Sequence, residues 1–376
     1  MPSIADLISF LKTFAAADLA EEWDNVGLLL GDRGGSVSRV LTCLTLTEGV
    51  AQEAIAERVE LVVTHHPVLF RPVKRLTADD PQGKMLWDLA RAGIAVYSPH
   101  TGYDNAANGI NQQLARLLDL TDVAPLRPTF APPQCKVVCF VPRDALAAVQ
   151  EAMWSQGAGV IGEYSKCSFV LDGTGSFWGS SSSQPTVGAS GRLEQVTEAR
   201  LEVVCPADKV AAVLDHLRKV HPYEEPAYDV YPLQSGPSAR GAGRVGTLPI
   251  AATEPGNRRM ALSELLSKIR DRLPAPGLQY VGDPAREVSR VGICCGSGGE
   301  LLDAAAAGGC DVFLTGEARF HTCLEAQSLG IALILAGHYA TERPAMEYLA
   351  GVLAEKFTEI AVWASRSERD PIQCGW

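Results

Sequence analysis

The sequence predicts an α/β protein of two similar lobes with helix-covered sheets that form a central cleft, plus an inserted ferredoxin-like α+β domain. Three observations predict this fold class. The outer parts of the 376-residue chain share an internal repeat, proline- and glycine-rich segments set them apart from the middle, and the middle has a half-repeat of its own. We therefore expect an N-terminal lobe at 1–125, an insert at 131–233 and a C-terminal lobe at 241–376.

The repeat in the outer parts consists of short apolar strands that alternate with helix-like segments. Its first copy runs through Arg39–Leu44, Glu48–Arg58 and Leu61–Val63. Its second copy runs through Arg290–Cys295, Glu300–Ala307 and Asp311–Leu314. Each copy continues with another helical stretch and a third strand. Such alternation predicts a parallel or mixed sheet that is covered by helices.

The insert is predicted from two strand-and-helix units. The segments Val137–Asp144 and Leu201–Asp208 each lead into an apolar helix that is followed by another strand. A repeated β-α-β unit of this kind is typical of a ferredoxin-like module. The Gly- and Ser-rich stretch Gly173–Ser190 predicts a mobile loop within it. On either side of the insert, Pro125–Pro133 predicts a stiff linker and Gln234–Gly243 a flexible one.

Composition and charge exclude several classes of protein. With 47% hydrophobic residues, the chain has ample material for buried cores and is not extensively disordered. A net charge of -11 argues against broad nucleic-acid binding. The 10 cysteines include no CxxC pair, the start of the chain lacks a signal-peptide pattern, and no apolar run is long enough to span a membrane. We therefore expect a reduced, cytoplasmic protein without a membrane segment.

Histidines and carboxylates gather where predicted strands end. Two apolar runs are each followed by a histidine that stands four residues before a carboxylate, and a third run is followed by adjacent histidines. These clusters are His100 with Asp104, His338 with Glu342, and His65 with His66. Ligands of open α/β sheets sit beyond the carboxyl ends of the strands, so two facing lobes would bring the clusters into one cleft. Because Zn²⁺, Mn²⁺ and Fe²⁺ share imidazole and carboxylate ligands, the pattern predicts a metal site.

Each of these clusters also has a purely structural interpretation. His65 and His66 could be one core and one surface histidine, because neighbouring strand residues point to opposite faces. Glu342 could instead be a carboxylate at the N-terminus of the helix that begins near it. Asp104 could likewise be a helix N-cap.

Three further segments allow more than one role. Gly296–Gly299 joins a strand to a helix and could cradle a phosphate, although a tight turn is the simpler interpretation. Glu317 and His321 stand in the second copy where His65 and His66 stand in the first. Glu317 or His321 is therefore our candidate for proton transfer, the alternative being a polar turn that faces solvent. Glu22–Gly27 has no metal-ligand spacing and is interpreted as a loop in which Trp23 packs beside a turn.

Together these motifs resemble the NIF-three-like family, whose members are also called GTP cyclohydrolase type 2 homologues. The matching motifs, in chain order, are Glu22–Leu28, Thr64–Pro67, His100–Asp104, Thr315–Glu317 with His321, and Gly337–His338 with Glu342. They span nearly the whole chain. The segment His221–Pro226 makes the insert similar to the PII-like module of longer family members.

The resemblance implies a dinuclear metal site in a central cleft and a homo-oligomer, a toroidal hexamer built from dimers. The ligands of two divalent ions (Zn, Mn or Fe) would be His65, His66, Asp104, His338 and Glu342. Glu342 would be the bridging carboxylate. One departure is Thr45, where many members have an aspartate, and it leaves open how the first strand supports the cleft.

These expectations favour a metal-dependent hydrolase that acts on a small-molecule or nucleotide-like substrate. Two ions that share a carboxylate would supply a nucleophile and polarise the bond to be broken. The competing class is a non-catalytic regulatory or metal-handling protein, whose insert senses a ligand or contacts a partner. Turnover of a nucleotide by the metal-loaded protein distinguishes the two.

Overall fold

The computed structural model describes residues 1–130, 132–234, 236–249 and 259–374. The chain divides into two compact units, one made of Met1–Thr129 with Ser238–Trp376 and the other of Phe130–Pro237. The predicted insert, 131–233, falls within the second unit, although Ala131 lies outside the described residues. Parts of the predicted C-terminal lobe, 250–258 and 375–376, also lie outside them.

The first sheet of the larger unit has five strands in the order β1-β4-β3-β2-β19. Its strands are β1 (Gly27–Leu30), β2 (Arg39–Cys43), β3 (Leu61–Thr64), β4 (Ala95–Ser98) and β19 (Ala361–Ala364). The last four run parallel to their neighbours, and β1 pairs antiparallel with β4. The strands predicted at Arg39 and Leu61 are therefore confirmed, each to within one residue at its end.

The second sheet of the larger unit repeats this arrangement. It has six strands in the order β14-β18-β17-β16-β12-β5. These are β5 (Thr121–Ala124), β12 (Arg244–Thr247), β14 (Gln279–Val281), β16 (Arg290–Cys294), β17 (Val312–Thr315) and β18 (Ala332–Leu335). Strands β16, β17 and β18 are parallel and correspond to β2, β3 and β4, while β14 pairs antiparallel with β18 as β1 does with β4. The mixed α/β class and the internal repeat are thus confirmed.

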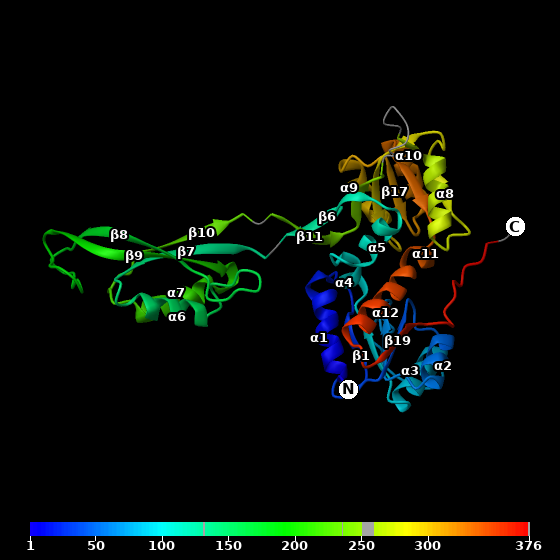
Figure 1. Cartoon of the computed structure of the whole chain (residues 1–376), viewed down its shortest axis with the longest axis horizontal. Coiled ribbons are helices and arrows are strands. Elements are labelled where there is room, and N and C mark those ends of the chain that lie inside the picture. Colours follow the sequence, from blue (N-terminus) through cyan, green and yellow to red (C-terminus); the bar gives the residue numbers. More distant parts are fainter. Residues whose placement is uncertain (131, 235, 250–258, 375–376) are drawn as a thin grey trace. The chain divides into compact units, whose positions relative to one another are not determined.

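The two lobes exchange their outermost strands. β19 comes from the end of the chain but pairs with β2 in the first lobe, and Figure 1 labels it close to β1 of that lobe. β5 comes from the first lobe but pairs with β12 in the second. Boundaries at 1–125 and 241–376 do not describe this exchange. Both strands are four-residue segments, and nothing in so short a local pattern specifies which sheet will accept them.

Helices connect and cover these strands. They are α1 (Ile4–Phe14), α2 (Glu48–Ala56), α3 (Pro81–Arg91), α4 (His100–Asn105), α5 (Ile110–Leu117), α8 (Leu262–Arg272), α9 (Leu302–Ala307), α10 (Phe320–Leu329), α11 (His338–Glu342) and α12 (Pro344–Lys356). Minor elements are η1 (Ala17–Leu19), η3 (Gly299–Leu301), β13 (Met260–Ala261) and β15 (Glu287–Val288). Local signals set the ends: Asp80 caps α3 with Pro81 in its first turn, and Gly330, at φ 69°, ends α10. No helix of the described residues is long and apolar enough to cross a membrane.

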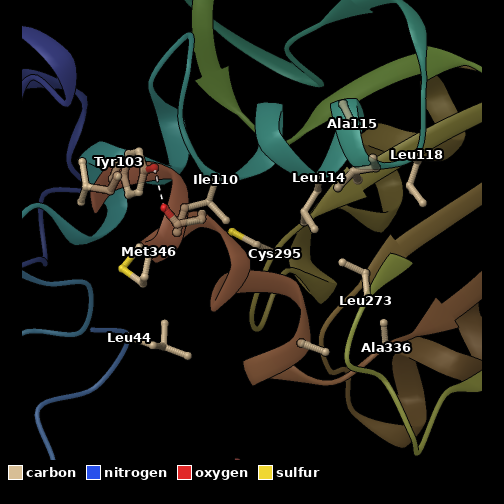
Figure 2. Close-up of a cluster of buried hydrophobic side chains, with 14 of the residues drawn as sticks. Leu44, Tyr103, Ile110, Leu114, Ala115, Leu118, Leu273, Cys295, Ala336 and Met346 are labelled. Carbon is tan, nitrogen blue, oxygen red and sulfur yellow. Dashed lines mark hydrogen bonds between the residues drawn. The ribbon is translucent and has the colours of Figure 1, made fainter. Parts of the chain in front are cut away.

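One hydrophobic core runs through both lobes of the larger unit. It includes Leu44, Tyr103 and Ile110 from the first lobe and Cys295 and Met346 from the second part of the chain (Figure 2). Two polar groups tie α12 to this core: the Tyr103 hydroxyl donates to the carbonyl of Ala345, and the Thr42 hydroxyl donates to that of Met346. Because both lobes share one packed core, residues at their strand ends are held in fixed relation to one another.

The insert has the predicted ferredoxin-like topology. Its elements are β7 (Gln134–Val141), α6 (Leu146–Ser155), β8 (Phe169–Trp178), β9 (Leu193–Pro206), η2 (Ala207–Lys209), α7 (Val210–Val220) and β10 (Tyr228–Leu233). The antiparallel sheet has the order β10-β7-β9-β8, and both helices pack on a core of its own that includes Val137, Met153, Leu201 and Leu217. The prediction of a mobile loop at Gly173–Ser190 was wrong for the first third of that range, because residues up to Trp178 pair with β9.

The segments that join the insert to the larger unit are strands. β6 (Arg127–Phe130) and β11 (Pro237–Ala242) form a two-stranded sheet, and the hydroxyls of Thr129 and Ser238 lie 2.9 Å apart. The prediction of a flexible linker at Gln234–Gly243 was therefore wrong for most of that range. Considered alone, the glycines and serines of this segment suggest a flexible backbone. Pairing between β6 and β11 nevertheless holds it in an extended conformation.

Replacing 130–237 by a short Gly-Ser linker should leave a soluble protein that still binds divalent metal. Thr129 and Ser238 are already adjacent, and the core of the insert is separate from that of the larger unit. We expect a midpoint of thermal unfolding within about 4 °C of the parent value for the larger unit, and unchanged metal content. Insolubility or metal loss over several linker lengths would show that the larger unit depends on the insert.

Candidate metal centre

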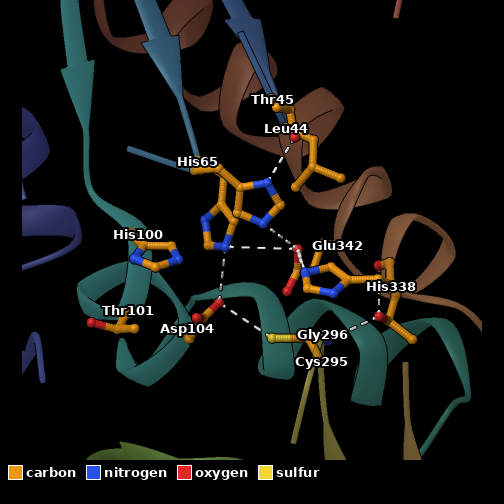
Figure 3. A network of polar contacts seen from close by, with 12 residues as sticks. Leu44, Thr45, His65, His100, Thr101, Asp104, Cys295, Gly296, His338 and Glu342 are labelled. Atoms are coloured by element: carbon orange, nitrogen blue, oxygen red, sulfur yellow. Dashed lines mark hydrogen bonds and ion pairs between the residues drawn. The ribbon is translucent and has the colours of Figure 1, made fainter. Parts of the chain in front are cut away.

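Four histidines from the ends of three strands meet in the larger unit. His65 and His66 directly follow β3, His100 begins α4 just after β4, and His338 begins α11 just after β18 (Figure 3). The rings lie in contact range: the centroids of His65 and His66 are 5.1 Å apart, as are those of His65 and His100, and those of His66 and His338 are 5.2 Å apart. Both lobes therefore contribute imidazoles to one cluster. His100 adopts φ 32°, a strained backbone conformation that is common at functional sites.

Glu342 is the carboxylate shared by the histidines of this cluster. Its Oε2 lies 3.1 Å from Nε2 of His66 and 3.1 Å from Nε2 of His338, and the latter pair is spaced i, i+4 along α11. The side chain is buried, and α12 begins only two residues later. Its carboxylate faces the histidines of both lobes, so the structural alternative of a simple charge at a helix N-terminus does not account for its position.

His65 is buried without a hydrogen-bond partner. Its side chain is 1% exposed, and neither ring nitrogen is bonded to a described group. Nε2 lies 3.7 Å from Asp104 Oδ1 and 3.9 Å from Glu342 Oε2, beyond hydrogen-bond length. Buried polar atoms are almost always paired, and a bound cation would satisfy an imidazole that faces two carboxylates. Two donors bound to one ion at about 2.1 Å are separated by roughly 3–4 Å, which agrees with these distances.

The other three histidines are each held at Nδ1 by an oxygen outside the cluster. His66 Nδ1 lies 2.7 Å from the Thr45 hydroxyl, and His338 Nδ1 lies 3.1 Å from Glu317 Oε1. His100 Nδ1 lies 2.7 Å from Asp24 Oδ1. A hydrogen bond at Nδ1 orients the ring and leaves Nε2 as the ligand nitrogen, an arrangement that is typical of metal-binding histidines. The Thr45 hydroxyl thus orients the His66 ring.

Asp104 has the second carboxylate of the cluster. It lies within α4 rather than at the N-cap of α5, which is Gly109, so its N-cap alternative is excluded. Its Oδ1 accepts a hydrogen bond from the Cys295 thiol at 3.2 Å, and the Cys295 amide is held by the side chain of Asn111. Burial and the nearby Glu342 raise the pKa of Asp104 to about 7.

Burial and mutual contacts shift the pKa values of several residues in this cluster. Burial lowers the pKa of His65 well below its usual value, so this ring is neutral and able to act as a ligand. Burial disfavours charge on Glu342 and His338 as well, but their mutual contact outweighs it, lowering the pKa of the carboxyl and raising that of the imidazole to about 9. Metal binding at this cluster should therefore release protons.

Two overlapping sets of three side chains have the proximity that a metal ion requires. One set is His65, His66 and His100, and the other is His66, His338 and Glu342. Within each set, one ligand-type atom per residue lies within 4.8 Å of the others. The donor set and the orphaned His65 both fit divalent metal ions.

Gly296 makes room for the Glu342 carboxylate. It follows β16 with φ 59°, and a Cβ added there would lie 2.1 Å from Glu342 Oε1 and 3.2 Å from His338 Nε2. Its carbonyl accepts hydrogen bonds from the amides of Gly316 and Glu317. The Gly296–Gly299 segment is thus a tight turn that packs against the cluster, which agrees with the simpler of the two predictions.

The structure brings together the five ligands implied by the resemblance and adds residues that sequence reasoning placed elsewhere. His100 was noted as part of a cluster but not as a ligand, and Asp24 was assigned to a simple loop. Glu317 reaches the cluster through His338. His321 is exposed on α10, with its ring against Phe320, and no contact between it and the cluster is among the described interactions. Its role in proton transfer stays a prediction.

Asp24→Asn should weaken metal binding by about 10- to 100-fold, the usual effect of losing an outer hydrogen-bond partner. The buried carboxylate accepts bonds from His100 Nδ1, from the Thr101 amide and from the Thr101 hydroxyl, and these lower its pKa to about 2 despite burial. An asparagine would point an NH₂ group at one of these donors. Competition with a chelator measures the affinity, and Glu22→Gln at the exposed neighbour is the control. Equal affinity in the Asp24 variant would show that His100 takes no part.

The cluster lies in the wall of a cavity of about 430 Å³. His66, His100, Asp104, His338 and Glu342 line one part of it. The described lining contains no lysine or arginine. A cavity of this size is in the range of small-molecule sites.

Comparisons with known proteins find relatives that match nearly the whole chain. Residues 2–371 match the family model Duf34/NIF3 (NGG1p interacting factor 3). A GTP cyclohydrolase 1 type 2 homolog of Bacillus subtilis is 35% identical over 368 residues, which cover 97% of this chain and 96% of the relative.

Solved structures of similar proteins cover the whole chain. A Bacillus cereus protein related to NIF3 is 33% identical with a TM-score of 0.75, covering 100% of this chain and 99% of that one. Staphylococcus aureus protein SA1388 is 28% identical with a TM-score of 0.82, covering 99% of each chain. The two-lobed unit and the insert thus occur together in other proteins.

Proposed function

The chain belongs to the Duf34/NIF3 family, and on that premise we propose that it is a dinuclear metal-binding protein that hydrolyses a nucleotide-like substrate. The observation that carries the proposal is the pairing of a buried, unpartnered His65 with a Glu342 carboxylate that faces two further histidines. The name of the Bacillus subtilis relative supports a nucleotide-like substrate.

The residues of the cluster would divide the work of holding two divalent ions. His65 Nε2 lies 3.7 Å from Asp104 Oδ1, and Nε2 of His66 and of His338 each lie 3.1 Å from Glu342 Oε2. His100 is a further candidate ligand. When bound, the ions would lower the pKa of water and polarise the bond to be broken. Thr45, Asp24 and Glu317 would keep the imidazoles oriented.

Glu317 is the better placed of the two predicted proton-transfer residues. Its side chain is about half exposed and lies 3.1 Å from His338 Nδ1, so it could pass a proton between that ring and solvent. This role goes beyond orienting His338 and requires a pH-rate profile to test it.

The proposal is tested by a turnover screen of purine and pyrimidine nucleotides with protein loaded with Zn²⁺, Mn²⁺ or Fe²⁺. We expect turnover of at least one substrate, lost in Glu342→Gln and retained in Glu347→Gln, whose exposed carboxylate pairs with Arg343. No turnover with any loaded form, or equal turnover in the Glu342 variant, would favour the non-catalytic alternative. The separate core of the insert is the observation that favours such a regulatory role. The predicted hexamer stays a prediction, which light scattering would test.

A further inference from the structure

Two aromatic side chains lie exposed beside the metal centre. The Trp23 side chain is 62% exposed and Phe70 is 47% exposed, although the sequence suggested that Trp23 would pack in a loop. Their rings contact each other edge to face, with centroids 5.9 Å apart. Folded proteins bury most of their large aromatic surface, and adjacent exposed rings at a cavity commonly mark a binding surface.

The backbone that carries these rings is anchored on both sides. Next to Trp23, the Asp24 carboxylate is bonded to His100 and Thr101. The Asn25 side-chain amide then donates to the carbonyl of Leu69, the residue before Phe70, at 2.5 Å. The Trp23 and Phe70 segments are therefore tied to each other and to the metal centre. An exposed ring on a fixed backbone loses little conformational freedom when a ligand covers it.

The aromatic pair continues into the candidate metal cluster. The His100 ring is 6.2 Å from Trp23 and 6.3 Å from Phe70, centroid to centroid. Both aromatic residues line the same cavity as His66, His338 and Glu342. A ligand that covers the Trp23 ring would thus have its other end beside the cluster.

The charge of the cavity wall restricts what that ligand can be. Its described lining includes Glu21, Asp104, Glu300 and Glu342, and neither lysine nor arginine. A polyphosphate chain would meet no lysine or arginine side chain in this described lining. Apart from the histidines, only bound metal ions would offer positive charge, and these can be reached by one carbonyl or anionic group. The aromatic rings are the larger recognition surface.

We propose that Trp23, supported by Phe70, receives a planar heterocyclic ring of the substrate beside the metal cluster, and that this ring rather than a phosphate chain provides most of the recognition. Stacking on an aromatic face is tolerant of ring identity, so the surface fits nucleobases and related heterocycles. The inference rests on the proposed function, because it assigns the substrate class of that same site.

Calorimetric titration of the metal-loaded full-length protein with inosine and uridine tests this assignment without requiring turnover. At least one of them should bind, and ribose, which lacks the ring, should not. Trp23→Ala should weaken binding by about 5- to 100-fold, whereas Trp23→Phe should stay within about fivefold of the parent. Inosine 5′-monophosphate should bind within about tenfold of inosine. Trp178→Ala, at an equally exposed tryptophan of the insert (66%), is the matched control and should change nothing.

Metal content and oligomeric state are measured on the same Trp23→Ala sample and should equal those of the parent. The inference is overturned if neither nucleoside binds the parent, if Trp23→Ala binds as tightly as the parent, or if the monophosphate binds more than 100-fold tighter. Loss of metal in Trp23→Ala would make Trp23 a support for His100, and a changed assembly would make it a contact between copies. Either result contradicts ring recognition. Ring binding without turnover of any substrate would refute the hydrolase proposal and leave this one standing.

Discussion

Glu342→Gln should reduce the bound divalent metal from about two ions per chain to one or none. A carboxylate offers two charged oxygens that can each contact an ion, whereas an amide offers one good ligand atom and no charge. Two cations a few ångströms apart repel each other, and a shared negative charge offsets that repulsion. The Glu342 carboxylate lies 3.1 Å from histidine nitrogens of both lobes, so its loss affects both sides of the cluster.

Elemental analysis at matched metal concentration measures this stoichiometry. Asp104→Asn is the informative comparison, because the described ion-pair contact of Asp104 is with His65, so its loss should mainly weaken one ion. Glu347→Gln, five residues further along, controls for the change of charge. Equal stoichiometry in Glu342→Gln and the parent would show that the carboxylate does not bridge two ions.

Gly296→Ala should reduce metal binding almost as much as Glu342→Gln does. The added methyl group would lie 2.1 Å from Glu342 Oε1, a distance that no packing allows, so the carboxylate must leave its position between the histidines. The residue also has φ 59°, and a left-handed conformation costs a non-glycine residue about 1–2 kcal/mol of stability. We therefore expect both a loss of metal and a lower free energy of unfolding.

Gly309→Ala separates these two effects. Gly309 has φ 69°, but a Cβ there meets no atom within 4 Å. It should show the same backbone cost in urea unfolding while keeping its full metal content. If both alanine variants retain metal, the turn at Gly296 is not what positions Glu342.

The parts of the fold that could be predicted are those with a local signal. β2, β3, β16 and β17 are apolar runs bounded by polar turns, and each was located to within one or two residues. The partners of β5 and β19 could not be predicted, because pairing in a sheet depends on hydrogen bonds between segments far apart in the chain.

In the candidate site, too, residues with a local sequence signal could be predicted, and residues that act through distant contacts could not. The clustered histidines could be found because they stand at strand ends, where parallel sheets gather side chains from separate segments. Asp24 and Cys295 could not, since each acts through one tertiary contact, with His100 and Asp104 respectively. The Glu22–Leu28 motif did contain a signal for Asp24. Two neighbouring residues of that motif contribute to the site, because Asp24 orients His100 and Trp23 lines the cavity. Thr45 was recognised as a departure, and only the structure shows that its hydroxyl faces His66.

The exchange of β5 and β19 between the lobes also determines the order in which the parts of the site can assemble during synthesis of the chain. During synthesis Asp104 leaves the ribosome about 260 residues before β19, and His65 and His66 about 295 residues before it, a delay of roughly 13–60 s at ~5–20 residues per second. Throughout that interval the edge of β2 that β19 will pair with is open, and Glu342 has not yet been made. The nascent chain therefore holds only part of the ligand set. We therefore expect high-affinity metal binding to begin only after Glu342 has been made and has packed against the histidines of the first lobe.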